Sequence, residues 1–204
     1  MANSVVIISK SYIVGFLRFV ITVVDLIFKD SSVSIIKTIL FNFHFLPYEQ
    51  AVLLPIWLYS PHILEQDGEV NIINSHIYSG MIKLGKSCIA LYPRKSITLA
   101  FIKGSKTIFH GNCFIGNCST IRVIGRLEFG NDFCATYRMS LLCMDRIFLE
   151  YSNTFAWDIL IMDCSQHMLK DVNTGKKRTL YKKKYCLVTI YGFVAEQPFC
   201  QALN

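Results

Sequence analysis

Apolar residues recur at every sixth position through the middle of the chain. The first series contains Phe109, Ile115, Ile121 and Leu127. The second starts 20 residues later and contains Phe129, Ala135, Leu141 and Ile147, and the third contains Leu149, Phe155 and Ile161. A period of six fits neither the 3.6-residue helix nor a simple hairpin, but it is typical of a hexapeptide β-solenoid. We therefore expect triangular coils made of three hexads plus two extra residues at a corner, with the first residue of each hexad pointing inward.

Small and polar residues follow several of these inward positions. Gly116 and Gly130 come directly after an inward residue, where a turning backbone leaves little room for a side chain. Asn117, Asn131 and Asp132 stand beside them and are residues that favour turns. These positions are the expected corners of the coils.

The sequence before the hexads has a different texture. Residues 4–28 are apolar and fit a helix or a strand, and the polar residues 30–32 then interrupt them. Residues 37–59 are rich in aromatics, but Pro47 and Pro55 exclude one continuous helix there. From Gly68 onward, short apolar pieces alternate with turn residues. We expect an N-terminal apolar cap over 1–67, an all-β solenoid over 68–169, and a basic loop with an irregular tail over 170–204.

Composition limits the class of protein further. The 204 residues are 52% hydrophobic and 17% charged, which excludes an intrinsically disordered chain. Mean hydropathy is +0.39, so a membrane span has to be considered. The best candidate, Ile13 to Phe28, contains Arg18 and Asp25, whereas a span needs about 20 mostly apolar residues and each central charge costs about 2.5–3.5 kcal/mol. We expect a helix on a membrane surface or packed on the domain, and no span.

The eight cysteines contain no C-x-x-C pair, and the chain has no recognisable cleavable signal. They are expected to be small buried hydrophobes in a reducing compartment. A zinc site formed by His110, Cys113 and Cys118 is conceivable, but its spacing is not a standard one and we expect no metal.

The net charge of +7 is concentrated in one segment. Seven cations and one anion lie between Lys170 and Lys184, so the rest of the chain is nearly neutral. Such a segment fits a phosphorylated cofactor or an anionic surface, and a solvated loop is an equal alternative. Nucleic acid is not an expected partner, because the segment lacks a recognised nucleic-acid module.

Candidate chemistry follows the last hexad. Asp163 and His167 stand just after Ile161, and histidine is the side chain best suited to accept a proton near neutral pH. Asp163 is close enough in sequence to orient the imidazole, and Trp157 offers a flat apolar wall for a sugar ring. From periodicity alone, a histidine that caps a turn is an equal alternative.

These residues resemble a known family. The hexads followed by W-D-I-L-I-M-D-C-S-Q-H are similar to bacterial hexapeptide-repeat acyltransferases of the left-handed parallel β-helix fold. Residues 37–59 and the sequence G-M-I-K-L-G (80–85) are similar to a subgroup linked to surface-polysaccharide biosynthesis, and the resemblance spans residues 37–175. The family motif I-M-D-x-x-x-H is matched, but the usual T-D-F between its ends is Cys164, Ser165 and Gln166 here.

The resemblance implies an O-acetyltransferase. His167 would be the general base, Asp163 its partner, and acetyl-CoA the acyl donor to a hydroxyl of a sugar or polysaccharide precursor. The acceptor would meet three further residues, namely Trp157, Asp158 and Gln166. CoA phosphates would meet the basic residues Lys176, Lys177 and Arg178. The family also implies a homotrimer with its sites at subunit interfaces, and we expect a cytoplasmic protein, peripheral to the inner membrane if the cap touches lipid.

The end of the chain departs from the family. After residue 175 the hexads do not resume, and the family coils that help to hold CoA are missing. A frameshift within the lysine run 182–184 would explain this, because the shifted codons permit hexads. We therefore expect weak or absent activity. The alternative function is a non-catalytic solenoid that binds a glycan or a membrane surface.

Overall fold

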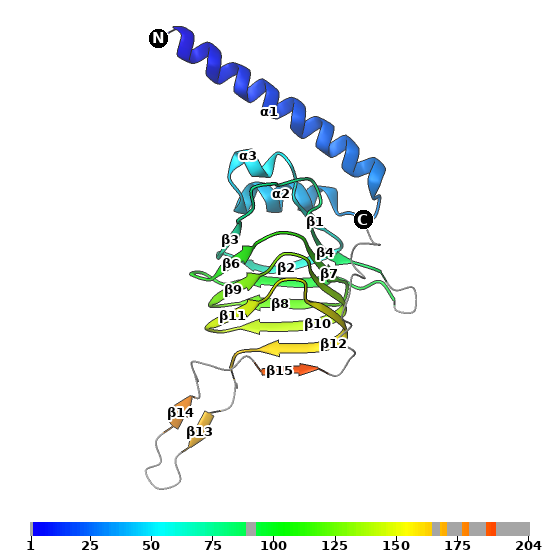
Figure 1. Cartoon of the computed structure of the whole chain (residues 1–204), viewed down its shortest axis with the longest axis vertical. Helices are drawn as coiled ribbons and strands as arrows, with labels where there is room; N and C mark the ends of the chain where they lie inside the picture. The colour runs from blue at the N-terminus through cyan, green and yellow to red at the C-terminus, as the bar shows by residue number, and fades with distance from the viewer. Residues whose placement is uncertain (1, 89–92, 165–167, 171–176, 180–186, 191–204) are drawn as a thin grey trace.

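The computed structural model describes residues 2–88, 93–164, 168–170, 177–179 and 187–190. Three helices lie at one end of a stack of short, mostly parallel strands (Figure 1). The helices are α1 (Ala2–Lys29), α2 (Ile35–Phe45) and α3 (Tyr48–Ala51). The chain then adds strand after strand away from the helices, which gives the coarse architecture that the sequence predicts: an all-β, solenoid-like body with an N-terminal cap.

The parallel strands form three faces. The first contains β1 (Ile56–Leu58), β4 (Ile82–Lys86), β7 (Cys113–Gly116) and the first parts of β10 (Phe133–Cys143) and β12 (Thr154–Met162). The second contains β2 (Pro61–Gln66), β5 (Ile97–Phe101), β8 (Thr120–Val123) and the last parts of β10 and β12. The third contains β3 (Glu69–Ile72), β6 (Lys106–Phe109), β9 (Arg126–Phe129) and β11 (Arg146–Leu149). Each coil visits the three faces in order, and the predicted boundary at residue 68 falls inside the first coil.

The hexad prediction for the core is confirmed. All eleven residues of the three series are buried. Equivalent residues of successive coils are register partners: Ile115 pairs with Ala135 and Ala135 with Phe155, while Phe109 pairs with Phe129 and Phe129 with Leu149. The rings of Phe109 and Phe129 are stacked, with centroids 5.0 Å apart. The core is therefore a set of columns, each with one residue per coil.

The corners are tight, as the glycines predict. A Cβ on Gly116 would lie 1.7 Å from the carbonyl oxygen of Thr136 in the next coil, and one on Gly130 would lie 2.6 Å from the carbonyl carbon of Glu150. The sequence predicts both extra residues of each coil at one corner, but in the structure they are divided between two corners. In the coil that starts at Cys113, three residues separate the strands at the first corner (faces one and two) and at the third corner (faces three and one), against two at the second corner.

Left-handed backbone conformations absorb the extra residues. Cys118, Arg138 and Asp158 have positive φ at the first corner of three successive coils. Asp132 and Ser152 have positive φ at the third corner. A single left-handed residue turns the chain sharply, and aspartate is among the residues that tolerate this conformation best.

The N-terminal segment is helical, which is one of the two structures that its sequence allows. The apolar residues before position 30 form α1, which ends at Lys29, where the polar residues 30–32 begin. Pro47 separates α2 from α3, so the aromatic segment is not one helix. Among the described residues, no helix combines the length and the apolar character that a membrane crossing requires.

Helix α2 covers the open edge of the first coil with a polar stripe. Ser34, Thr38 and Asn42 are spaced by four residues, and their side-chain oxygens accept hydrogen bonds from the backbone N–H groups of residues 60, 58 and 56, at 3.1, 3.0 and 3.1 Å. Asn42 Nδ2 also donates to the carbonyl of Ile56 at 2.7 Å. Four helical residues rise about 6.0 Å and two strand residues about 6.7 Å, so the two repeats match.

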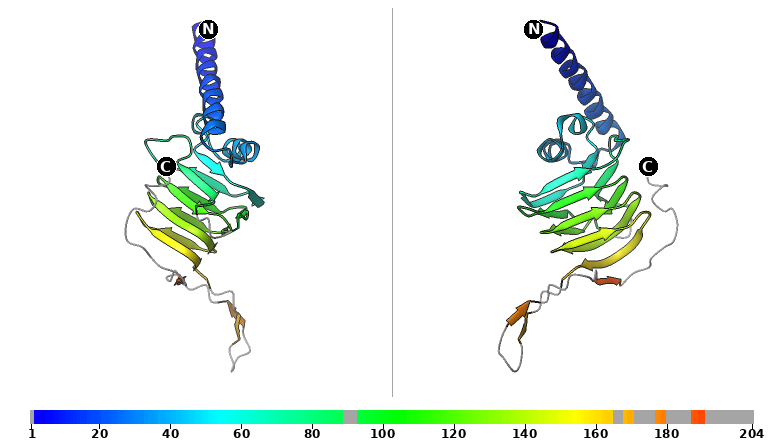
Figure 2. Two further views of the ribbon diagram at one scale, coloured as in Figure 1. Left: turned by 90° about the vertical axis from the view of Figure 1, so that its right-hand side faces the viewer. Right: turned by 60° about the vertical axis from the view of Figure 1, so that its left-hand side comes forward.

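The other end of the stack is covered differently. β15 (Leu187–Ile190) pairs antiparallel with the last part of β12. β13 (Met168–Lys170) and β14 (Lys177–Thr179) form a separate antiparallel pair that extends away from the coils (Figures 1 and 2). The tail thus leaves the parallel arrangement, in agreement with its lack of hexads.

Candidate active site

The predicted site residues that the structure describes with their side chains lie at two corners of the last coil. Trp157 and Asp158 stand at the first corner, and Asp163 stands at the second. The second-face part of β12 runs between them. Five strand residues span about 17 Å, so these two groups do not share one site within a single copy of the chain.

Asp163 is held by the preceding coil. Its Oδ1 accepts a hydrogen bond from the backbone N–H of Met144 at 2.8 Å, and its Oδ2 accepts those of Asp145 and Arg146 at 2.7 and 2.8 Å. A carboxylate has about four lone-pair sites, and three are used here. The Asp of the motif therefore closes the second corner of the coil before it, and at most one acceptor site is left for an imidazole.

The thiol of Cys143 lies beside this carboxylate. Its Sγ is 3.9 Å from Oδ2 of Asp163 and 3.3 Å from the carbonyl oxygen of Arg126. Burial, with the negative charge of Asp163 as the next cause, raises the pKa of Cys143 to about 12. This thiol is therefore protonated at neutral pH and is no candidate nucleophile.

Trp157 and Asp158 have different surroundings. Trp157 is exposed, as a wall for a ligand requires. Asp158 forms a short ion pair with Arg138 of the preceding coil, so its carboxylate already has a cationic partner. Contact between Asp158 and the acyl-acceptor substrate remains a prediction. A substrate at this position would meet the Asp158–Arg138 ion pair and not an isolated carboxylate.

The remaining predicted residues belong to the last segments of the chain. His167, Gln166 and Lys176 lie outside the described residues. Lys177 and Arg178 are on β14, opposite Lys170 and Leu169 of β13. Figures 1 and 2 show this hairpin projecting beyond the last coil, which places the backbone of these two basic residues away from the core.

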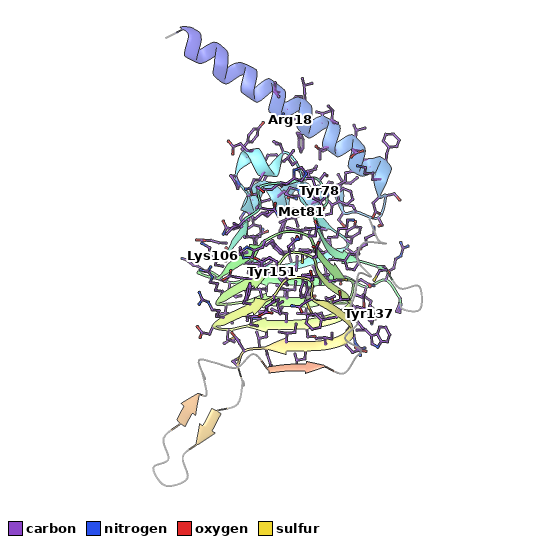
Figure 3. The ribbon with its side chains drawn as sticks, viewed as in Figure 1. Arg18, Tyr78, Met81, Lys106, Tyr137 and Tyr151 are labelled. Carbon is purple, nitrogen blue, oxygen red and sulfur yellow. The ribbon has the colours of Figure 1, made fainter. Side chains whose placement is uncertain are left out.

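The first corner contains residues that the sequence analysis did not single out. Figure 3 shows Tyr137 there, at the edge of the stack. Two described residues between β4 and β5 contact the same corner: Cys88 Sγ donates to the Thr136 carbonyl at 3.2 Å, and the Pro93 carbonyl accepts a hydrogen bond from Asn117 Nδ2 at 3.2 Å. The signal that could have identified the corner is the 20-residue spacing of Cys118, Arg138 and Asp158.

A second unpredicted cluster lies on the third face. Glu128 accepts a hydrogen bond from Arg126 Nε at 2.6 Å, and its other oxygen is 3.2 Å from His110 Nε2. The bond from Arg126, with a smaller contribution from His110, holds the pKa of Glu128 below its usual range, although burial opposes this. The cluster joins side chains of two successive coils on the outer surface of the third face.

Among the described cysteines, Cys113, Cys134 and Cys143 are buried as expected, whereas Cys88, Cys118 and Cys164 are half-buried. Cys88, Cys113, Cys118, Cys143 and Cys164 are free. Burial raises the pKa of Cys113 well above its ordinary value, which opposes its use as a zinc ligand. Among the described residues, no three His, Cys, Asp or Glu side chains are grouped so that they could hold a metal ion. Cys134 is disulfide-bonded, which departs from the expectation of reduced thiols.

No family model matches the chain, and no match is found among the curated proteins or the solved structures.

Proposed function

We propose that the protein is a CoA-dependent O-acyltransferase that transfers an acetyl group to a sugar hydroxyl, slowly because the hexads do not resume in the residues after 175. The finer features that the sequence resemblance implies, a left-handed winding of the coils and a homotrimer, belong to the same proposal. The observation that carries it is the placement of the I-M-D motif. Ile161 is buried in the column of the second face, and Asp163 anchors the chain at the corner from which His167 follows.

The proposed reaction needs one base. The imidazole of His167 accepts the proton of the acceptor hydroxyl, and the hydroxyl oxygen attacks the carbonyl carbon of the thioester. A C–O bond forms, the C–S bond breaks, and the departing CoA sulfur takes the proton back from the imidazolium. No metal or redox step is required to balance this reaction.

Asp163 acts in this proposal as a positioning residue. Three backbone N–H groups fix its carboxylate, and it therefore fixes the start of the segment that leads to His167. Asp163→Asn keeps the size but loses one acceptor oxygen. We expect kcat to fall by about tenfold because the His167 base is misplaced. The KM for acetyl-CoA should stay unchanged, because Asp163 does not bind the acyl donor. Asp145→Asn, on the same corner with an exposed side chain, is the matched control.

The separation of the two corners supports a site shared between copies. The second-face part of β12, about 17 Å long, lies between the first corner and Asp163, so Trp157 contributes to catalysis only at the second corner of a neighbouring copy. Mixing inactive His167→Ala subunits with inactive Trp157→Ala subunits should then restore part of the activity, because some interfaces combine two intact residues. No recovery in mixed oligomers would contradict a shared site.

Binding of the donor separates this proposal from a non-catalytic scaffold. At about a hundredfold excess over Kd, acetyl-CoA should stabilise the fold by about 2.7 kcal/mol, which for a chain of this size raises Tm by about 5–10 °C. A scaffold that binds only glycan or membrane should show no change. The sugar class is tested in the same assay, with the acceptor added after the donor.

A further inference from the structure

Helix α1 carries a broad apolar surface that the rest of the molecule leaves uncovered. Eight of its large apolar side chains are exposed: Val14, Phe16, Leu17, Val20, Ile21, Val24, Ile27 and Phe28. Phe28 is 85% exposed. At 100° per residue these eight positions span an arc of about 160°. Surfaces of this extent on a protein mark an interaction site.

The opposite side of α1 packs on the body. Leu26 is fully buried, and the ring of Phe19 contacts that of Phe43 in α2, with centroids 5.5 Å apart. Gly15 lies against Tyr48, whose hydroxyl would be 2.9 Å from a Cβ at this position. The helix is therefore held on one side only, and its apolar arc points away from the coils.

Helix α2 carries a second, separate apolar stripe. Ile36, Leu40 and Phe43 are exposed and spaced by four and three residues, so they form one stripe along this helix. Phe43 in that stripe contacts Phe19 on the packed side of α1, so the α2 stripe is not continuous with the exposed arc of α1. Figure 1 shows both helices at the end of the stack opposite the hairpin of β13 and β14.

The charges beside this surface are almost all positive. Helices α1 and α2 contain four cations, Lys10, Arg18, Lys29 and Lys37, and a single acid, Asp25. Lys29 pairs with Asp25 at 2.6 Å, which neutralises the acid. Arg18, labelled on the helix in Figure 3, has no acidic group within ion-pair distance among the described residues.

These features fit a lipid surface better than a second helix. A partner helix covers a narrow seam with charges on both flanks, and would leave the outer members of this arc, such as Phe16, Val20 and Ile27, in water. A bilayer covers the whole arc, and anionic headgroups complement the charge of Arg18. We infer that the exposed arc of α1 docks the protein on the surface of an anionic membrane, with α1 lying along that surface.

Vesicle flotation tests this inference with a closely matched pair of variants. Leu17 on α1 is 54% exposed and Leu64 on β2 is 53% exposed, so the same substitution changes equally accessible leucines inside and outside the surface. The full chain should float with phosphatidylcholine vesicles that contain phosphatidylglycerol, and less with phosphatidylcholine alone. Leu17→Glu should weaken vesicle binding at least roughly tenfold, whereas Leu64→Glu should leave it unchanged.

Three results would overturn the inference. The wild-type chain fails to float with either vesicle, or Leu17→Glu floats as well as the wild type. The third is an oligomer by light scattering that Leu17→Glu dissociates in the absence of vesicle binding, which would identify the surface as a contact between copies. Circular dichroism of each variant verifies folding, and the inference does not depend on the proposed acyltransferase activity.

Discussion

The two ends of the coil stack have the same kind of strand edge, but different elements cover it at each end. At the N-terminal end, the side chains of Thr38 and Asn42 in α2 and of Ser34 just before it bond to the backbone of the first coil. At the other end, β15 pairs antiparallel with β12, and Asp163 takes up the N–H groups of the corner before it. An uncovered edge is a template for aggregation, so both ends need a cover.

The comparison shows how a repeating fold ends. Within the stack, the strands of each coil pair their backbone hydrogen-bonding groups with those of the next coil. The side chain at a position then matters mainly through whether it points inward or outward. At the N-terminal end, single side chains take the place of a neighbouring strand, whereas at the other end the antiparallel strand β15 does so together with the side chain of Asp163. We therefore expect single substitutions at the two ends to have larger effects on the free energy of unfolding than outward substitutions within the stack, and the N-terminal cover to be the stronger one.

The largest effect is expected at Asn42. Asn42→Leu removes both partners of the Ile56 backbone in a fully buried position, which should lower the free energy of unfolding by about 3 kcal/mol. Urea denaturation measures the change. Asn71→Leu, on a half-buried position of β3, is the control and should change stability by less than about 0.5 kcal/mol. Equal effects of the two variants would contradict the cover role of α2.

Asp163 should come next. Asp163→Ala leaves three backbone N–H groups at the second corner without their acceptor. We expect the free energy of unfolding to fall by only about 2 kcal/mol, because two of these N–H groups are exposed and can bond to water instead. Differential scanning calorimetry would detect the fall in Tm. Asp145→Ala at the same corner should have little effect, and a comparable loss there would show that the carboxylate of Asp163 has no special role.

Thr38 tests a single bond of the N-terminal cover. Thr38→Val keeps the shape but removes the hydroxyl that accepts the N–H of Leu58, and we expect a loss of about 1–2 kcal/mol. The double variant with Asn42→Leu should lose less than the sum of the two, since both act on one strand. Strict additivity would show that the two side chains act independently.

The antiparallel strand should contribute least. Replacing Val188 and Thr189 by proline removes the backbone donors of β15, and we expect a loss below about 1 kcal/mol because the strand is short. Hydrogen exchange should then show faster exchange in residues 159–162 alone. A global loss of protection would contradict the view that this cover is the weaker one.

The two ends should also differ in their response to pH. Burial acts to raise the pKa of Asp30, but hydrogen bonds from Ser32, Tyr59 and Lys86 outweigh it and lower the pKa, so its stabilisation is lost as pH falls through the folded-state value. The pKa of Cys143 is raised from about 9 to about 12, so its stabilisation is complete below pH 9 and is lost as pH rises toward 12. Asp30→Asn should flatten the acid limb of a stability–pH curve and Cys143→Ala the alkaline limb. Unchanged limbs would contradict both assignments.

Much of the fold could be predicted from sequence because it repeats. Phe109, Phe129 and Leu149 form one column, and their spacing already indicated it. The division of the extra residues between two corners could not be predicted, because it depends on which residue takes positive φ, as Arg138 does. The cover by Ser34, Thr38 and Asn42 was also missed, since a polar stripe on a helix is ordinarily assigned to solvent.

The candidate site was predicted less completely. The motif was found, but the sequence gives no measure of which corner a residue occupies, so Trp157 and Asp163 were placed in one site although a strand separates them. The partners of Asp158 and Asp163 are 17 to 20 residues away along the chain, one coil earlier, and such contacts become visible only when the coils are stacked.

Release of free CoA from acetyl-CoA, measured in the presence and absence of sugar acceptors, tests the proposed acyl transfer most directly. We expect slow release that depends on the acceptor and falls at least about a hundredfold in His167→Ala, with the folding of that variant unchanged. Release that is absent from the wild type, or equal in wild type and His167→Ala, would contradict it.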